Sequence, residues 1–239
     1  MSGTLILQGN SFDPYYNLAV EETLAGYCAG KYKALYLWQN DNTVVIGKNQ
    51  DIHDEVDLEY AGTHDIRLAR RVSGGGAVYH DKGNLNFTFA GSQNETDVIV
   101  RAMTILGFNV QTTGRNDIEI VSDRISAKFS GNAYYKSGCT CFHHGTILID
   151  TDFDVMSKVL TPDKDKLEGH GVKSVKSRVV NLCEVMPTIT VDDVKSAIIK
   201  AFEDKYGTAE PSDISSLNAD DIESARQRLA STEWIYGSK

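Results

Sequence analysis

Three consecutive glycines, Gly74 to Gly76, stand between a pair of arginines and a run typical of a β-strand. The stretch reads RRVSGGGAVYH over residues 70–80 and leads into the alternating LNFTF of residues 85–89. Glycine adopts backbone angles closed to other residues and lets a ligand lie close to the main chain. The pattern therefore predicts a strand, a glycine loop and then a hairpin that runs to residue 89.

The composition of this loop favours an anion as its ligand. Arginine offers a planar fork suited to phosphate or carboxylate, and the free amides of a glycine turn form an anion-binding concavity. A purely structural turn also needs glycine, so the loop by itself leaves both interpretations open. No Gly-Lys-Ser or Gly-Lys-Thr follows at Walker spacing, and the sequence after the loop predicts a strand, which excludes a dinucleotide fingerprint.

The overall charge and length narrow the class of protein further. A net charge of -9 argues against a general nucleic-acid binder, so any anion must be met by local basic groups. The N-terminus has no basic flank and no apolar run approaches a membrane span, which predicts a cytoplasmic protein without membrane contact. The 239 residues suit one α/β domain, and the four cysteines match no zinc-binding spacing.

Helices and strands alternate along the chain. Asp13 and Pro14 predict a helix start, and the helix is expected to run to about residue 30. Thr190 and Asp193 form a capping box that starts another helix. Further helices are expected over residues 55–61 and 95–106, and a last helix is expected to begin near residue 219 and to end before Trp234. Strands are expected over residues 4–8, over 34–38 and 43–46 as a pair joined by the turn 39–42, and over 108–149 with breaks at 114–117 and 131–132.

Three polar clusters could carry chemistry, although each also has an ordinary structural explanation. Asn116 and Asp117 follow a turn, where a carboxylate could hold magnesium through nucleotide phosphates or simply stabilise the turn. Lys128 lies in a strand-like context and could face solvent or reach an acyl or phosphoryl group. His143 and His144 enter an apolar strand and could be buried hydrogen-bonding residues as readily as a site. The polar, lysine-rich segment 161–178 lacks periodicity, as surface loops do.

Taken together, these motifs resemble the lipoate-protein ligase family. The run from Arg70 to Phe89 comes first, followed by GRND at 114–117, KFSG at 128–131, HHGT at 143–146 and GVKSVKSRV at 171–179. The stretches LWQN at 37–40 and TVVIG at 43–47 also match the early strands of that family. The resemblance covers nearly the whole chain.

The resemblance implies a fold class and a reaction. The fold is an α/β (α+β) domain with a mixed, bent β-sheet flanked by helices, as in the biotin and lipoyl ligases. The reaction has two steps, in which lipoate attacks ATP to give lipoyl-AMP and a lysine of an acceptor protein then takes the lipoyl group. The implied cofactors are ATP and Mg²⁺, with lipoate as substrate. The implied acceptors are lipoyl domains of 2-oxoacid dehydrogenase complexes or the glycine cleavage H protein.

Site residues are carried over from the matching motifs. Lys128 corresponds to the lysine that contacts the carboxyl and phosphate oxygens of the adenylate, so it is the expected catalytic residue. Asp117 is expected to face magnesium, with Asn116 beside it at the nucleotide phosphate. The loop from residue 169 to 182 corresponds to a segment that folds over the adenylate. The remaining expected binding residues are Arg71, Ser73, Gly74, Gly75, Gly76, Ala77, Val78, His80, Asn84, His144, Gly145, Thr146 and Lys173.

Two features depart from the family pattern. The chain stops just after STEWIYG at 231–237, where two-domain relatives continue into an accessory domain, so residues 1–239 are expected to be the catalytic domain alone. Adenylate formation would then depend on a separate accessory protein, or the chain would only transfer a preformed lipoyl group. Cys139 and Cys141 leave a second alternative, an ATP-independent lipoyl or octanoyl transferase or amidotransferase that works through a cysteine thioester.

Overall fold

A bent, mixed β-sheet forms the centre of the molecule. The computed structural model describes residues 3–114, 116–122, 126–161 and 179–237. Within these residues an eight-stranded sheet has the order β11-β1-β2-β6-β10-β9-β8-β7, in which β1 is parallel to β11 and β2 and the other pairs are antiparallel. The strands are β1 (Gly3–Gln8), β2 (Tyr32–Trp38), β6 (Asn84–Ala90), β7 (Val110–Thr113), β8 (Asp117–Val121), β9 (Ser126–Ser137), β10 (Thr140–Leu148) and β11 (Glu210–Pro211).

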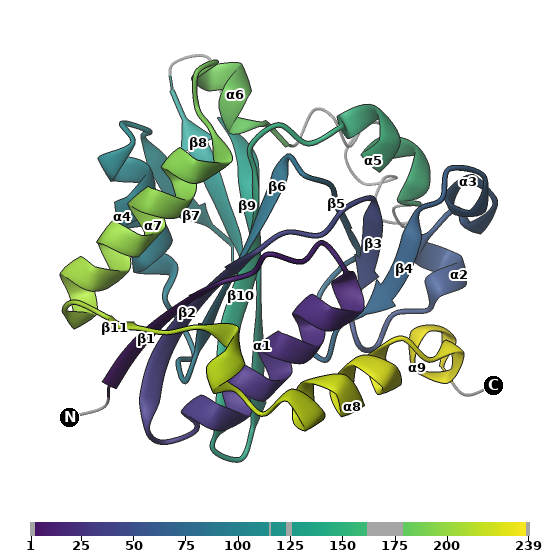
Figure 1. Cartoon of the computed structure of the whole chain (residues 1–239). Coiled ribbons are helices and arrows are strands. Elements are labelled where there is room, and N and C mark those ends of the chain that lie inside the picture. Colours follow the sequence, from purple (N-terminus) through teal and green to yellow (C-terminus); the bar gives the residue numbers. More distant parts are fainter. Residues whose placement is uncertain (1–2, 115, 123–125, 162–178, 238–239) are drawn as a thin grey trace.

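Helices cover both faces of this sheet, as Figure 1 shows. One core contains Leu35, Leu37 and Phe87 of the strands and packs against α4 (Thr96–Ile105) and α7 (Val191–Tyr206). The alternate residues Tyr36 and Trp38 belong to a second core with α1 (Pro14–Cys28) and α8 (Ala219–Leu229). Because successive side chains of a strand point to opposite faces, the two cores lie on opposite sides of β2.

A smaller sheet, ordered β4-β3-β5, lies beside the large one. Its strands are β3 (Thr43–Ile46), β4 (Arg67–Arg70) and β5 (Val78–His80), and it forms a third core with α2 (Ile52–Glu55), α3 (Leu58–Thr63) and α5 (Phe153–Val159). The helices α6 (Leu182–Val185) and α9 (Thr232–Tyr236) and the short 3-10 helix η3 (Ile214–Ser216) complete the described elements. No helix in the described part of the chain has the length and apolar character needed to cross a bilayer.

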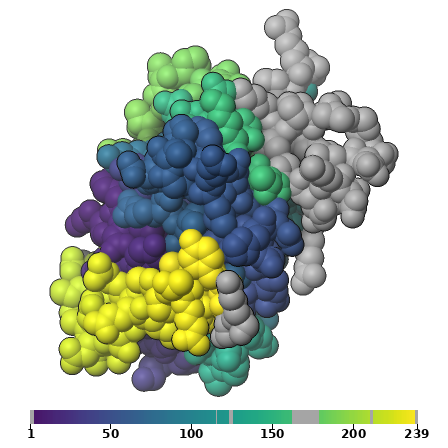
Figure 2. All heavy atoms as spheres, turned by 90° about the vertical axis from the view of Figure 1, so that its right-hand side faces the viewer, coloured from purple at the N-terminus to yellow at the C-terminus, as the bar shows by residue number. Residues whose placement is uncertain are grey.

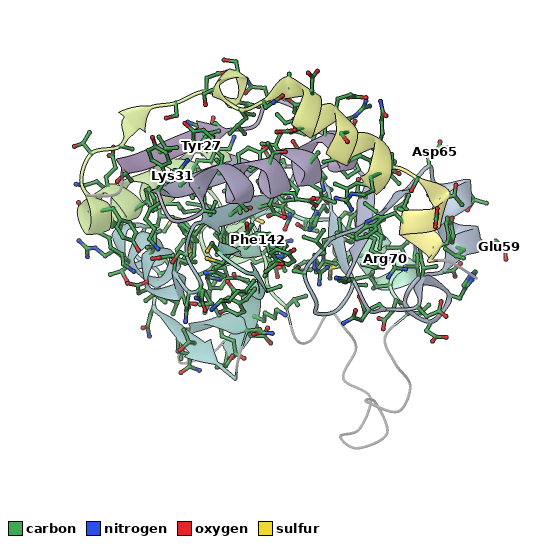
Figure 3. All side chains as sticks on the ribbon, turned by 90° about the horizontal axis from the view of Figure 1, so that it is seen from below. Tyr27, Lys31, Glu59, Asp65, Arg70 and Phe142 are labelled. Atoms are coloured by element: carbon green, nitrogen blue, oxygen red, sulfur yellow. The ribbon has the colours of Figure 1, made fainter. Side chains whose placement is uncertain are left out.

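Arg70 fastens the C-terminal helix to the small sheet. Its guanidinium donates to the backbone carbonyls of Trp234 and Ile235 in α9 and to those of Gly47, Lys48 and Gln50 after β3. The Trp234 indole donates back to the Arg70 carbonyl at 2.8 Å. Figure 3 shows Arg70 beside α9, and in Figure 2 the yellow C-terminal residues lie against blue residues from the part of the chain that contains the small sheet. Arg70 therefore links α9 to the small sheet, and its donors bind carbonyl oxygens of the protein.

The local signals of helix starts are confirmed. The Asp13 side chain accepts from the Tyr15 amide at 3.0 Å with Pro14 at the first helical position, and Thr190 and Asp193 form the capping box of α7. The expected bounds of the helix that begins near Ala219 are confirmed, because α8 starts there and ends at Leu229, before Trp234. That helix was wrongly expected to be the last one, because the short helix α9 follows it. The expected helix over residues 55–61 is two short helices, α2 and α3.

Three predicted strand arrangements were wrong. The strands β2 and β3 do not pair, since both edges of β2 are taken by β1 and β6. The glycine loop is not followed by a hairpin, because β5 pairs with β3 while β6 joins the large sheet between β2 and β10. Gly131 and Asn132 do not break a strand, because β9 runs through them opposite Thr146 and Gly145 of β10. Nearly all of the 161–178 segment lies outside the described residues.

Candidate functional site

A cavity of about 190 Å³ opens between the glycine loop and the large sheet. On one side it is bounded by residues 71–77, here called the glycine-loop wall, and on the other by residues 116–117 and 128–133 of the β8–β9 region, here called the strand wall. Residues of β6 and β10 lie between the two walls. The apolar part of the lining consists of Leu18, Trp38, Val45, Ala77, Val78 and Ala133. A cavity of this kind suits a ligand with an apolar portion and a polar or charged end.

Arg71 stiffens the glycine-loop wall from within. Its guanidinium donates to the carbonyls of Val45 at 3.1 Å, Gly74 at 2.8 Å and Gly76 at 2.8 Å, and to the Ser73 hydroxyl at 3.1 Å. Burial lowers the pKa of Arg71 to about 10, and the Glu21 carboxylate opposes part of this effect. Each guanidinium nitrogen therefore already donates to an oxygen of the loop or of β3, although the side chain also lines the cavity.

Gly75 shows why the loop needs glycine. Its φ of +98° lies in a region that side-chain-bearing residues rarely adopt. A Cβ at Gly75 would also lie 2.9 Å from a guanidinium nitrogen of Arg71, whereas one at Gly76 would meet no atom within 4 Å. The tight turn at Gly75 lets the carbonyls on either side of it converge on Arg71.

A buried polar chain runs behind this wall. The Ser73 hydroxyl lies 2.7 Å from Nε2 of His144, and Nδ1 of His144 lies 2.8 Å from the Glu21 carboxylate in α1. Ser73 is 1% exposed, so this serine braces the loop against β10 and does not face the cavity opening. The Glu21 carboxylate also accepts from the Thr88 hydroxyl, which ties α1, β6 and β10 together.

The strand wall carries the exposed charges. Lys128 Nζ lies 2.8 Å from the Asp117 carboxylate, and the two side chains are 35% and 43% exposed. Lys128 bends over Gly131, where a Cβ would meet Nζ at 3.1 Å. Because β8 and β9 are neighbours, the turn before β8 delivers Asp117 directly to the lysine. An ammonium group at a half-open cavity mouth can exchange its carboxylate partner for a ligand oxygen.

Three cavity-lining residues have a buried polar atom with no protein partner among the described residues: His80 Nε2, Asn86 Nδ2 and Asn116 Oδ1. The Asn40 amide faces Nδ1 of His80 at 3.1 Å with its amino group, because its oxygen accepts from Asn17. Burial, aided by the charges of Arg71 and His144, lowers the pKa of His80 to about 3. His80 is therefore neutral with its proton on Nε2. Since an unsatisfied buried donor costs about 1–3 kcal/mol, these atoms are available to hydrogen-bond with a molecule in the cavity.

The structure gathers most of the predicted site residues around the cavity. Arg71, Gly75, Gly76, Ala77, Val78, His80, Asn116, Asp117, Lys128, His144, Gly145 and Thr146 all line it. Ser73 lies behind the lining, Gly74 is exposed on the loop, and Asn84 reaches the cavity only through the 3.0 Å bond from its amide to Asn86. Lys173 lies outside the described residues.

Sequence reasoning missed several lining residues, among them Leu18, Trp38, Asn86 and Asn132. Asn86 carried a usable signal, because Asn84, Asn86 and Thr88 alternate with Leu85, Phe87 and Phe89 in a strand that is buried throughout. A polar stripe on one face of a fully buried strand indicates a lined cavity or a polar network. Leu18 and Trp38 carried no such signal, because apolar residues of this kind are ordinary core residues.

Several solved structures that are similar along nearly the whole of this chain are lipoate-protein ligases, and this is the class of protein to which the fold points. The bi-partite lipoate protein ligase of Thermoplasma acidophilum, described with its E2 lipoyl domain, is 28% identical with a TM-score of 0.83, covering 99% of this chain and 97% of that one. P. falciparum LipL1 in complex with lipoate is 30% identical with a TM-score of 0.82, covering 99% and 75%. A lipoate-protein ligase A bound with ATP is 26% identical with a TM-score of 0.78, covering 99% of each chain.

The sequence of the chain also matches a family model. The family described as "Lipoyl protein ligase A/B catalytic domain" matches residues 13–203, which span both walls of the cavity. The chain belongs to this family.

Proposed function

We propose that this chain is a lipoate-protein ligase that activates lipoate with ATP and transfers the lipoyl group to a lysine of a lipoyl domain. The observation that carries the proposal is the cavity, which places Lys128 and Asp117 at the mouth of an apolar slot lined by Leu18, Trp38 and Val78. The slot suits an aliphatic chain with a dithiolane ring, and the lysine suits the carboxylate at its end. Relatives that bind lipoate and ATP support the same assignment.

In the first step a lipoate carboxylate oxygen attacks the α-phosphorus of ATP, and the bond from that phosphorus to the pyrophosphate oxygen breaks. Both reactants are anions, so the reaction needs positive charge where they meet. Lys128 supplies that charge in this proposal, and its ammonium leaves Asp117 for the reacting oxygens. The Nε2–H of His80 and the amide of Asn86 are unpartnered donors available to the acyl or phosphoryl oxygens.

In the second step the ε-amine of an acceptor lysine attacks the acyl carbon, AMP departs, and an amide forms. The walls keep water from the mixed anhydride because the acyl chain lies among apolar residues. The proposed acceptors are lipoyl domains of 2-oxoacid dehydrogenase complexes or the glycine cleavage H protein. A lipoyl-domain acceptor is supported by the Thermoplasma acidophilum relative, which is described with such a domain.

Magnesium is part of this proposal. Among the described residues no group of three or more metal-binding side chains occurs, but Asp117 and the unpartnered Asn116 Oδ1 offer oxygen ligands at the cavity. Such a sparse oxygen set fits Mg²⁺, which keeps waters and is held largely by nucleotide phosphates. When bound, the ion would neutralise phosphate charge beside Lys128. A separate accessory protein for the activation step is also proposed, in keeping with the bi-partite relative.

The decisive experiment incubates the chain with ATP, Mg²⁺, lipoate and a lipoyl domain and measures the intact mass of the acceptor. We expect the acceptor to gain one lipoyl group only when all four components are present. Lipoate-dependent exchange of pyrophosphate into ATP tests the first step alone. Absence of both signals, with and without an accessory subunit, would rule the proposal out.

A further inference from the structure

A buried hydrogen-bond relay connects the layer of α4 and α7 to the strand wall. It begins at Glu95, which precedes α4, passes through His143 in β10 and Asn132 in β9, and ends at the backbone carbonyl of Asn116. Figure 1 shows α4 and α7 packed together on one side of the sheet that carries these strands. None of these contacts involves the reacting end of Lys128, so the relay is separate from the chemistry proposed above.

The first contact fixes the protonation of His143. The Glu95 backbone amide donates to Nδ1 of His143 at 2.9 Å, and a backbone amide cannot accept a proton in return. His143 is 0% exposed, and burial, followed by the charge of His144, lowers the pKa of His143 to about 3. The imidazole is therefore neutral, and its only proton lies on Nε2.

That proton fixes the orientation of Asn132. Nε2 of His143 lies 2.8 Å from Oδ1 of Asn132 and donates to it, so the amide must present its amino group on the other side. The amino group donates to the Asn116 carbonyl at 2.9 Å, and the Asn132 backbone amide donates to the same oxygen at 2.8 Å. A reversed amide would set donor against donor at His143 and oxygen against oxygen at Asn116.

Glu95 is itself held firmly. Its carboxylate, 3% exposed, accepts from Lys205 at 2.6 Å and from the hydroxyls of Tyr206 and Ser92. Two of these partners belong to α7, so the start of α4 cannot shift without breaking buried bonds. The relay therefore begins at a rigid anchor on the far side of the sheet from α1.

We infer that Asn132 is a positioning residue for the nucleotide end of the cavity, with His143 and Glu95 setting its direction. Asn132 clamps the Asn116 carbonyl from two sides, and the next residue, Asp117, is the partner of Lys128. The inference rests on the proposed function, because it assigns the Asn116–Asp117 turn to ATP. It predicts that loss of the clamp weakens ATP binding and leaves lipoate binding in the apolar slot unchanged.

The test is Asn132→Asp, which keeps the acceptor for His143 and replaces the donor to Asn116 with a second oxygen. We expect ATP affinity, measured by calorimetry with Mg²⁺, to fall on the order of tenfold, with lipoate affinity unchanged within about twofold. The matched control is Asn109→Asp. Asn109 also donates from its amide to a backbone carbonyl, that of Val121 at 3.1 Å, but at the other end of β8. Both affinities should be unchanged in this control.

A second pair of variants distinguishes an effect of the relay on ATP affinity from a general loss of stability. His143→Gln and His143→Asn both remove the buried ring, but only glutamine has an amide long enough to reach Asn132. Asparagine can only replace the acceptor for Glu95. We expect His143→Gln to retain ATP affinity better than His143→Asn at similar melting temperatures.

The outcomes distinguish the two levels of the proposal. If the wild-type chain neither binds ATP nor exchanges pyrophosphate, the proposed function and the inference fall together. If the wild type binds ATP and folded Asn132→Asp binds it equally well, the inference alone is overturned. Equal loss of ATP and lipoate affinity in Asn132→Asp would also overturn it, because that result indicates general damage to the cavity.

Discussion

The two walls of the cavity use their basic residues in opposite ways. In the glycine-loop wall, Arg71 is buried and donates to carbonyls of its own loop and of β3. In the strand wall, Lys128 is about one-third exposed, and among the described residues its carboxylate partner is Asp117, at the cavity. The arginine of the loop most suggestive of anion binding in the sequence thus donates to protein carbonyls, while the proposed ligand contact is a partly exposed lysine of an ordinary strand. The number of uncommitted donors, more than the number of charges, distinguishes a binding wall from a structural one.

The largest expected effect is on the strand wall. Lys128→Ala should reduce lipoate-dependent pyrophosphate exchange by about 100-fold or more, because it removes the positive charge from the place where two anions react. The melting temperature should stay close to that of the wild type, since the lysine is partly exposed and its ion pair contributes little to stability.

Lys136→Ala is the matched control for this variant, because Lys136 is an exposed lysine of the same strand, β9, away from the cavity. Its exchange rate should match that of the wild type. Near-normal exchange in folded Lys128→Ala would remove the lysine from the proposed mechanism and with it the contrast between the two walls.

Substitution of the arginine in the glycine-loop wall should lower the stability of the fold. Arg71→Met removes the donor to the carbonyls of Val45, Gly74 and Gly76. Each of these carbonyls that stays buried without a partner lowers the free energy of unfolding by about 1–3 kcal/mol. Gly74 and Gly76 are exposed, so water can replace part of the loss, and we expect a decrease of about 3 kcal/mol in the free energy of unfolding. Chemical denaturation measures this directly.

Arg101→Met provides the baseline for that measurement, because Arg101 is exposed and its ion pair with Asp204 spans 3.9 Å. It should change stability by less than about 0.5 kcal/mol. If Arg71→Met instead keeps its stability and loses ATP affinity, then Arg71 serves the ligand, as the sequence alone predicted, and the contrast between the walls fails.

The range of each contact along the chain decides what could be predicted from the sequence. Helix starts were predictable because Asp13 and Thr190 act through amides two or three residues away. Strand pairing was not, because β2 and β3 adjoin in sequence while β1 and β6 compete for both edges of β2. Site membership followed from whole motifs, which place Lys128 and His144 at the cavity. The role of Arg71 could not be predicted, because its acceptors include Val45, 26 residues away.

Gly131 illustrates the same limit within one strand. A glycine followed by asparagine predicted a break in the strand, yet β9 continues through it. The space where a side chain of Gly131 would lie is filled by Lys128, at 3.1 Å from Nζ. The glycine thus makes room for the lysine, a reason that appears only once both residues are placed in three dimensions.

Neighbouring glycines of the loop offer a smaller and sharper test. Gly75→Ala should lower the free energy of unfolding by about 1–2 kcal/mol, because φ is +98° and the new methyl group meets Arg71. Gly76→Ala should fold with near-normal stability, because its methyl group meets no protein atom within 4 Å. Gly76 lines the cavity, so its methyl group should instead raise the KM for lipoate. Equal destabilisation by both substitutions would contradict the part assigned to Arg71 and Gly75.

The smallest expected effect concerns the cysteines. A thioester mechanism needs a thiol at the cavity, but none of Cys28, Cys139, Cys141 and Cys183 is among the lining residues. Cys139 is exposed at the tip of the β9–β10 hairpin, and the pKa of Cys183 is raised to about 11 by burial and by Asp150, which keeps that thiol protonated. We therefore expect the variant that carries both Cys139→Ser and Cys141→Ser to transfer the lipoyl group at the wild-type rate. Intact-mass analysis of a reaction quenched at low pH should find no acyl-cysteine. If the wild-type chain gains mass and the double variant does not, the acyl group is carried by the β9–β10 hairpin. The reactive part of the molecule would then be this hairpin and not the two walls of the cavity.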